Sequence, residues 1–183
     1  VNSPDILQFE EGISELCNVK YAVAVNSGTD ALTFALYCVG VRPGDEVITA
    51  PNSFIATAAA IIRLGAKPIF VDVCDDQNIN AELIENVLTE KTKAILPVHL
   101  TGRIANMNKI IDIGEKYNIP VIEDAAQAIG SKYNNKPSGS FGKVACFSTH
   151  PLKNLNACGD GGFITTNDKT IFEKANLLRE HGL

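Results

Sequence analysis

Short apolar runs alternate with helical patterns along most of this chain, and this alternation limits its fold more than any other feature. The apolar runs are continuous, as in strands that are buried on both faces. A strand–helix–strand repeat makes a right-handed crossover between parallel strands. The sequence therefore predicts an α/β fold, a three-layer α/β/α sandwich with a mainly parallel sheet. Only a loop separates the last two predicted strands, so an antiparallel pair can form there. The predicted strands are 22–25, 46–50, 68–73, 94–99, 120–123, 144–148 and 162–165, and the predicted helices are 29–39, 54–64, 81–88, 107–117 and 169–180.

Composition narrows the class of protein. The chain has 183 residues, of which 45% are hydrophobic, enough for one domain with a core. Its net charge of −5 argues against sequence-independent binding to nucleic acid. No apolar run is long enough to span a bilayer, and the start, VNSPDILQFEEG, does not look like a signal peptide, so we expect a cytoplasmic protein without a membrane partner. The five cysteines and three histidines show no metal-ligand spacing, so we predict core thiols and no metal site.

The residues that follow the predicted strands are rich in glycine and polar side chains. In an open parallel sheet, ligands bind beyond the carboxyl ends of the strands. After the first strand, NSGTDAL (26–32) leads into a helix, whose free N–H groups and positive end suit a phosphate. Gly28 lets the backbone approach a ligand closely, and Ser27 and Thr29 can donate hydroxyls. A plain helix N-cap by Ser27 or Thr29 accounts for the same pattern.

Three more residues in these segments suit a planar ligand with a ring nitrogen. Asp124 follows an apolar strand, where a carboxylate is costly unless it is paired, and a protonated ring nitrogen is a suitable partner. Gln127, three residues on, faces the same way if a helical turn begins there. Phe54 can stack on the ring. The alternatives are a helix cap or an internal ion pair for Asp124, and ordinary core packing for Phe54.

Lys153 lies on a loop between the last two predicted strands, flanked by Pro151 and a cluster of glycines. A lysine near a desolvated or cationic site becomes a nucleophile for aldehydes, whereas most lysines are solvated surface residues. Ser148, five residues earlier, can hydrogen-bond a phosphate. A phosphate at a helix start, a stacked ring, a ring nitrogen on Asp124 and an aldehyde on Lys153 together describe pyridoxal 5′-phosphate (PLP), held by Lys153 as a Schiff base.

In these same blocks the sequence resembles the DegT/StrS family of sugar aminotransferases, a branch of the fold-type I PLP-dependent transferases. The resemblance covers nearly the whole chain, and the order and spacing of the blocks match; they include NSGTDAL, DEVITAPNSFIATAAAI, VIEDAAQAIGS and FSTHPLKNLNACGDGGFITT. It implies a role for seven of the residues singled out above. Gly28, Thr29 and Ser148 would bind the phosphate, Phe54 would stack on the ring, Asp124 would meet the pyridine nitrogen, Gln127 would lie near the ring hydroxyl, and Lys153 would carry the cofactor.

The resemblance also implies substrates, partners and domain organisation. An amino acid, usually glutamate, would donate its amino group to a nucleotide-linked keto-sugar, in amino-sugar biosynthesis for an O-antigen, capsule or antibiotic. Family active sites form at the interface of a homodimer. Residues 1–183 would be the PLP-binding large domain, and we expect a fragment, because the family has a smaller C-terminal domain. Thr101 stands where many members carry an aromatic residue on the substrate side of the pocket.

Three other interpretations stay open at this point. A sugar dehydratase of the same family would have a histidine in place of Lys153. A non-catalytic remnant of the PLP fold, such as a regulatory or scaffold protein, would account for the missing C-terminal domain but not for the intact Asp124, Gln127, Ser148 and Lys153. A nucleotide-binding Rossmann protein would need a GxGxxG motif after the first strand, and this chain has none there.

Overall fold

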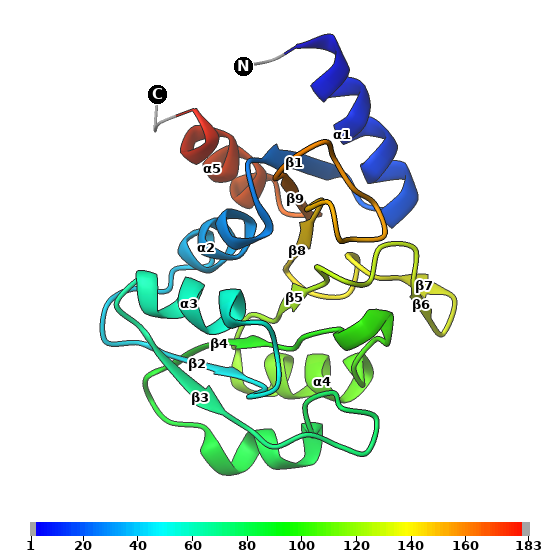
Figure 1. The fold of residues 1–183 in the computed structure, drawn as a ribbon. Helices are drawn as coiled ribbons and strands as arrows, with labels where there is room; N and C mark the ends of the chain where they lie inside the picture. Colours follow the sequence, from blue (N-terminus) through cyan, green and yellow to red (C-terminus); the bar gives the residue numbers. More distant parts are fainter. Residues whose placement is uncertain (1–2, 181–183) are drawn as a thin grey trace.

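A computed structural model describes residues 3–180 and contains one twisted sheet with helices on both faces (Figure 1). Hydrogen-bonded ladders give the orders β1-β9-β8-β5 and β3-β2-β4. Two parallel bridges, Ile95 with Val121 and Val98 with Asp124, join β4 to β5, so the full order is β1-β9-β8-β5-β4-β2-β3. The strands are β1 (Tyr21–Val25), β2 (Glu46–Thr49), β3 (Lys67–Phe70), β4 (Thr92–Leu96), β5 (Ile122–Asp124), β8 (Val144–Ser148) and β9 (Gly162–Thr166).

The sheet is mainly parallel, as predicted. The pairs β2–β3, β2–β4 and β5–β8 are parallel. β9 runs antiparallel to both of its neighbours, β1 and β8. The antiparallel pair β8–β9 occurs at the place where only a loop separates consecutive strands, because a loop without a crossover helix brings the chain straight back.

Helices cover both faces of the sheet. On one face, α2 (Gly28–Cys38), α3 (Ile55–Arg63) and α5 (Lys169–Arg179) lie side by side (Figure 1). The other face carries α1 (Pro4–Cys17), the 3₁₀ helix η1 (Ala81–Val87) and α4 (Met107–Tyr117). Along β8, Val144 and Cys146 join the core under α2, whereas Ala145 and Phe147 join the core under α1. This two-sided burial confirms the predicted three-layer α/β/α sandwich.

The element boundaries agree with the prediction within a few residues at most places, and α4 and β8 agree residue for residue. Five elements differ. The prediction missed α1, which is capped by Ser3 and has Pro4 at its start. The helix predicted at 81–88 is the 3₁₀ helix η1. A hairpin of two short strands, β6 (Lys132–Tyr133) and β7 (Lys136–Pro137), was also missed, as was the 3₁₀ turn η2 (Leu100–Gly102).

All five cysteines are free thiols, and Cys17, Cys38 and Cys146 are buried while Cys74 and Cys158 are exposed. Most of the thiols therefore belong to the core, as the sequence indicated. Over residues 3–180, no helix combines the length and the apolar character needed to cross a bilayer.

Candidate active site

A pocket of about 510 Å³ opens where the carboxyl ends of β5 and β8 meet the first turns of α2 and α3. Every residue singled out from the sequence as a ligand of a cofactor lines it. These eight residues are Ser27, Gly28, Thr29, Phe54, Asp124, Gln127, Ser148 and Lys153. They come from five separate stretches of chain, and the parallel strands bring them together because their carboxyl ends share one edge of the sheet.

One corner of the pocket is the first turn of α2. The Ser27 hydroxyl accepts a hydrogen bond of 3.0 Å from the backbone N–H of Asp30, so Ser27 does cap the helix. Among the described residues, the backbone N–H groups of Gly28 and Thr29 have no hydrogen-bond partner. A Cβ atom on Gly28 would lie 2.7 Å from the Cβ of Ser148, so only glycine allows this close approach. The corner thus offers two N–H groups and hydroxyls at the positive end of a helix, which suits a phosphate.

Asp124 is the last residue of β5, and it is 4% exposed. Its Oδ2 accepts a hydrogen bond of 2.7 Å from the Thr57 hydroxyl, and its Oδ1 accepts one of 3.2 Å from the N–H of Ala126. Burial raises the pKa of the Asp124 carboxyl, and these hydrogen bonds, with the charges of His99 and Lys153, oppose that rise. Within residues 3–180, Asp124 has no ion-pair partner within 4.0 Å, so the carboxylate suits a cationic ligand group.

Phe54 and Gln127 lie on the walls of the pocket. Phe54 precedes α3 and is 68% exposed, so ordinary core packing is excluded for its ring. The Gln127 Oε1 accepts a hydrogen bond of 2.8 Å from the backbone N–H of Thr101, whose φ of 54° is left-handed. The side-chain N–H₂ of Gln127 has no partner among the described residues, so it can donate to a ligand.

Lys153 lies on the loop between β8 and β9, and it is half-buried. Backbone hydrogen bonds from Thr149 to Gly161 and from Ala157 to Thr149, each 2.8 Å, close the base of this loop. A third bond of 2.8 Å, from the Lys153 N–H to the His150 carbonyl, fixes the turn that carries the lysine. Within residues 3–180 the Lys153 ammonium has no hydrogen-bond or ion-pair partner. It is therefore a cationic group, held on a defined loop and available to a ligand.

The sequence reasoning did not identify Thr57, Ser53, His99 or Glu123 as parts of this site. Thr57 and Ser53 line the pocket, and their hydroxyls are 2.6 Å apart. Thr57 lies in a run of alanines and isoleucines, IATAAAII, and its contact with Asp124 spans 67 positions, so no local pattern reveals it. The sequence did carry a signal for Glu123, because Glu123 is a second carboxylate directly before Asp124 in the run PVIEDA.

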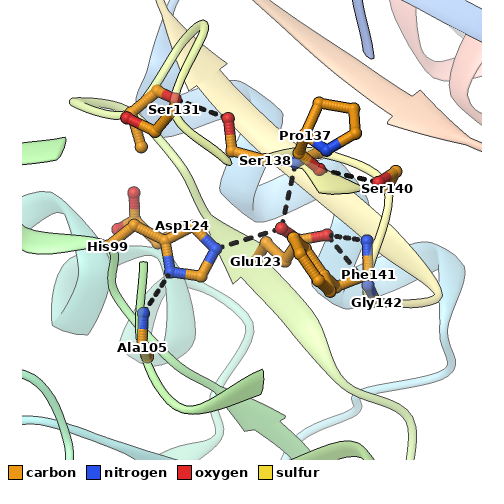
Figure 2. A network of polar contacts seen from close by, with 12 residues as sticks. His99, Ala105, Glu123, Asp124, Ser131, Pro137, Ser138, Ser140, Phe141 and Gly142 are labelled. Carbon is orange, nitrogen blue, oxygen red and sulfur yellow. Dashed lines mark hydrogen bonds and ion pairs between the residues drawn. The ribbon is translucent and has the colours of Figure 1, made fainter. Parts of the chain in front are cut away.

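Glu123 is fully buried beneath the pocket and makes four hydrogen bonds (Figure 2). Its Oε1 accepts from the N–H groups of Phe141 and Gly142, at 2.7 and 2.8 Å. Its Oε2 accepts from the N–H of Gly139 and from His99 Nε2, both at 3.0 Å. Neighbouring strand residues point to opposite faces, so this network fixes the end of β5 from below while Asp124 faces the pocket.

Comparison with known proteins identifies the family to which the chain belongs. The model of the DegT/DnrJ/EryC1/StrS aminotransferase family matches residues 1–183. The "Pleiotropic regulatory protein" of Geobacillus stearothermophilus is 48% identical over 178 residues, which are 97% of this chain and 48% of that protein. The UDP-N-acetyl-3-dehydro-alpha-D-glucosamine 3-aminotransferase of Acidithiobacillus ferrooxidans is 47% identical over 175 residues, 94% of this chain and 47% of that protein. This chain thus spans about half the length of these curated relatives.

Solved structures agree with the sequence comparison. The X-ray structure of S. venezuelae DesV in complex with a ketimine intermediate matches with a TM-score of 0.97 and 38% identity, covering 100% of this chain and 50% of that one. NtdA from Bacillus subtilis, with the cofactor PMP bound, matches with a TM-score of 0.91 and 38% identity, covering 97% of this chain and 40% of that one. The fold is that of fold-type I PLP-dependent aminotransferases. On these matches, the chain belongs to the DegT/DnrJ/EryC1/StrS aminotransferase family.

Proposed function

We propose that this chain is the cofactor-binding part of a PLP-dependent aminotransferase that moves an amino group from an amino acid, glutamate in the first instance, to a nucleotide-linked keto-sugar. The observation that carries the proposal is that, within residues 3–180, one pocket holds two unpaired charged groups, one suited to the ring nitrogen of PLP and one suited to its aldehyde. These groups are the Asp124 carboxylate, which is buried without an ion-pair partner, and the Lys153 ammonium, which has no partner among the described residues.

The residues of the pocket fit PLP in charge, shape and hydrogen-bonding capacity. The free N–H groups at the start of α2, with the hydroxyls of Ser27, Thr29 and Ser148, suit its phosphate. The exposed ring of Phe54 suits stacking, and the Gln127 amide suits the ring hydroxyl. Asp124 suits a protonated pyridine nitrogen, and Lys153 suits the aldehyde.

Bound PLP supplies an electron sink for the charge left when a substrate amine loses its α-proton. The chain's own groups then have separate tasks. Lys153 anchors the cofactor and, once displaced by the amino acid, moves the α-proton as a general base through its Nζ. Asp124 holds positive charge at the ring nitrogen, and the low polarity around it strengthens that interaction.

The keto-sugar, the amino donor, the homodimer and the cytoplasmic location also belong to this proposal. The name of the Acidithiobacillus relative, with its UDP-linked 3-dehydro sugar, supports the substrate class. The free thiols in the described structure are in keeping with a reducing compartment such as the cytoplasm. Since the chain spans about half of its relatives, we propose that the complete protein adds a smaller C-terminal domain. The homodimer is proposed from the family resemblance alone.

A regulatory, non-catalytic role is the second candidate, because the Geobacillus relative is named as a pleiotropic regulatory protein. The groups that such a role does not need, Lys153 and the buried Asp124, favour the enzyme. A sugar dehydratase is disfavoured because Lys153 occupies the position at which those family members have histidine.

The test is a visible absorbance spectrum of the purified full-length protein with added PLP, followed by borohydride reduction and peptide mapping. We expect an absorbance band and a reduced label on Lys153. Lys153→Ala should lose both the band and the label, and its transamination of a UDP-linked 3-keto sugar with glutamate should fall by about 10²–10⁴-fold.

Lys169→Ala is the matched control, since Lys169 is an exposed lysine that pairs with Glu173 on α5, away from the pocket. It should keep the band and the label. A label on a different lysine, or normal turnover by Lys153→Ala, would contradict the assignment. A band with no turnover on any keto-sugar would favour the regulatory role.

A further inference from the structure

Two hydroxyls link the rim of the pocket to the Asp124 carboxylate. The Thr57 hydroxyl, on the first turn of α3, lies 2.7 Å from Asp124 Oδ2. The Ser53 hydroxyl lies 2.6 Å from that of Thr57. Thr57 is 2% exposed, whereas Ser53 is half-buried. The two hydrogen bonds therefore lead from a partly solvent-exposed residue to the buried carboxylate.

Elementary chemistry fixes the direction of these hydrogen bonds when Asp124 is ionised. A carboxylate only accepts, so the one hydroxyl proton of Thr57 goes to Asp124 Oδ2. The Thr57 oxygen can then only accept from Ser53, so Ser53 donates to it. Each bond polarises the next in the same sense, which strengthens the contact with the carboxylate.

Within residues 3–180, no side chain other than Thr57 donates a hydrogen bond to Asp124. The second hydrogen bond to the carboxylate comes from the backbone N–H of Ala126. The other groups that influence it act through charge: His99 from the segment after β4 and Lys153 from the β8–β9 loop. The buried thiol of Cys146 on β8 and the carboxylate of Glu123 lie near it as well. Removing the Thr57 hydroxyl is therefore the most selective way to change the side-chain support of Asp124.

We propose that Thr57, backed by Ser53, is a positioning residue that orients Asp124 toward the pocket and keeps it ionised there, ready for a cationic ligand group. This inference rests on the proposed function for the identity of that group. The effect of Thr57 on the ionisation of the Asp124 carboxylate is independent of the proposed function, because that ionisation can be measured without a cofactor.

The competing explanation is that the Thr57 hydroxyl is merely a buried polar group that needs a partner. Thr49 provides the matched comparison, because it is also a buried threonine whose hydroxyl donates a short hydrogen bond, here 2.8 Å to the Leu96 carbonyl. Thr49 does not line the pocket. Thr57→Val and Thr49→Val both delete a buried hydroxyl, but only the former should change Asp124.

The first experiment follows the carboxyl ¹³C resonance of Asp124 against pH in the cofactor-free full-length protein, with Asp124→Asn to assign the signal. Because the Thr57 hydrogen bond favours the ionised carboxylate, Thr57→Val should move the titration midpoint to higher pH. Thr57→Ser, which keeps the hydroxyl, and Thr49→Val should leave the midpoint in place. Ser53→Ala should give a smaller shift in the same direction.

The second experiment measures PLP binding to the same variants. Loss of one hydrogen bond to a charged group should weaken binding by about tenfold in Thr57→Val, while Thr57→Ser and Thr49→Val stay near the wild-type value.

An unchanged midpoint in Thr57→Val, or an equal shift in Thr49→Val, would overturn the proposal. An unchanged midpoint in Ser53→Ala would remove Ser53 from it. If the wild-type protein binds no PLP, the proposed function fails, whereas the titration still decides the role of Thr57.

Discussion

Asp124 carries a cost in stability that its setting does not fully offset. Its carboxylate is buried, and the hydrogen bonds from Thr57 and Ala126 counter only part of the desolvation, so its pKa stays above the ordinary value of 3.8. A group whose pKa is higher in the folded protein than in the unfolded chain stabilises the fold when protonated. That stability is lost as the pH rises through the folded-state pKa. Ionisation of Asp124 in the free protein therefore costs stability, and a cationic ligand group would offset that cost.

The variant Asp124→Asn tests whether ionisation of this buried carboxyl costs stability. In the cofactor-free protein, the variant should become more stable relative to the wild type as the pH is raised from acid to neutral. The reason is that the wild type must ionise a buried carboxyl over this range, whereas the variant has none. Transamination should fall by about a hundredfold or more. Denaturant unfolding between pH 4 and pH 8, together with a turnover assay, measures both effects.

Asp168→Asn is a control with the opposite sign. Asp168 caps α5, and its hydrogen bond with Lys143 lowers its pKa. Its contribution is present at neutral pH and lost in acid, so this variant should fall behind the wild type as the pH rises. Parallel pH trends for the two variants would refute the interpretation of Asp124.

At this scale the sequence predicted much of the candidate site. All eight predicted residues lie in the pocket, because each lies at the carboxyl end of a strand or in the segment that follows it, at one edge of the sheet. Thr57 could not be found in the same way. Its relation to Asp124 depends on where the first turn of α3 meets the end of β5, which is a tertiary fact with no counterpart in local spacing.

Among the elements, the first turn of α2 and the end of β8 approach each other closely in the pocket. Gly28 lies against Ser148, and on β9 a Cβ atom at Gly162 would lie 2.6 Å from the carbonyl carbon of Ser27. The two glycines let helix and strands meet with no side chain between them. The position of the proposed phosphate corner therefore depends on these contacts as well as on the helix itself.

Gly28→Ala should push α2 away from β8. We expect a loss of stability of about 1–3 kcal/mol from overpacking, and PLP binding at least about tenfold weaker, measured by denaturant unfolding and by titration with PLP. Gly12→Ala on α1 is the control, because nothing lies within 4 Å of the added Cβ. It should stabilise the protein by about 0.5–1 kcal/mol and leave PLP binding unchanged. Equal PLP affinities for Gly28→Ala and wild type would contradict the close-packed corner.

α1 and η1 differ from the prediction for separate physical reasons. α1 buries only Ile13 and Cys17 among its fourteen residues, so its apolar pattern is weak, although Ser3 and Pro4 gave a start signal. η1 has the composition of a helix but the tighter 3₁₀ winding, which local propensity does not distinguish. The strands were easier, because burial on both faces makes them continuously apolar.

At the scale of the whole molecule, buried cysteines lie in the hydrophobic core on each face of the sheet, so their reactivity measures how well each core excludes solvent. Cys38 belongs to the cluster under α2, while Cys17 belongs to the cluster under α1. Burial raises the pKa of Cys17 to about 12 and that of Cys38 to about 11, and it raises the pKa of Cys146 well above its ordinary value. The thiolate is the reactive form, so these three sites are protected both by access and by protonation.

Thiol labelling of the native protein at pH 8 should therefore modify Cys74 and Cys158 first. The three buried thiols should react more than about a hundredfold more slowly, and should become reactive together across one denaturant transition. Mass spectrometry of the labelled peptides assigns each site. Separate transitions for Cys17 and Cys38 would mean that the two layers unfold independently.

The order of the strands has a consequence for synthesis on the ribosome. In the described structure, β1 pairs only with β9, and β9 also separates β1 from β8. Among the described strands, β1 therefore has no ladder partner until about 140 further residues have left the exit tunnel, as the positions of β1 and β9 require. Through that interval its edge stays open to other nascent chains. A chaperone that shields residues 21–25 should therefore raise the yield of folded protein more than one that acts on the later strands.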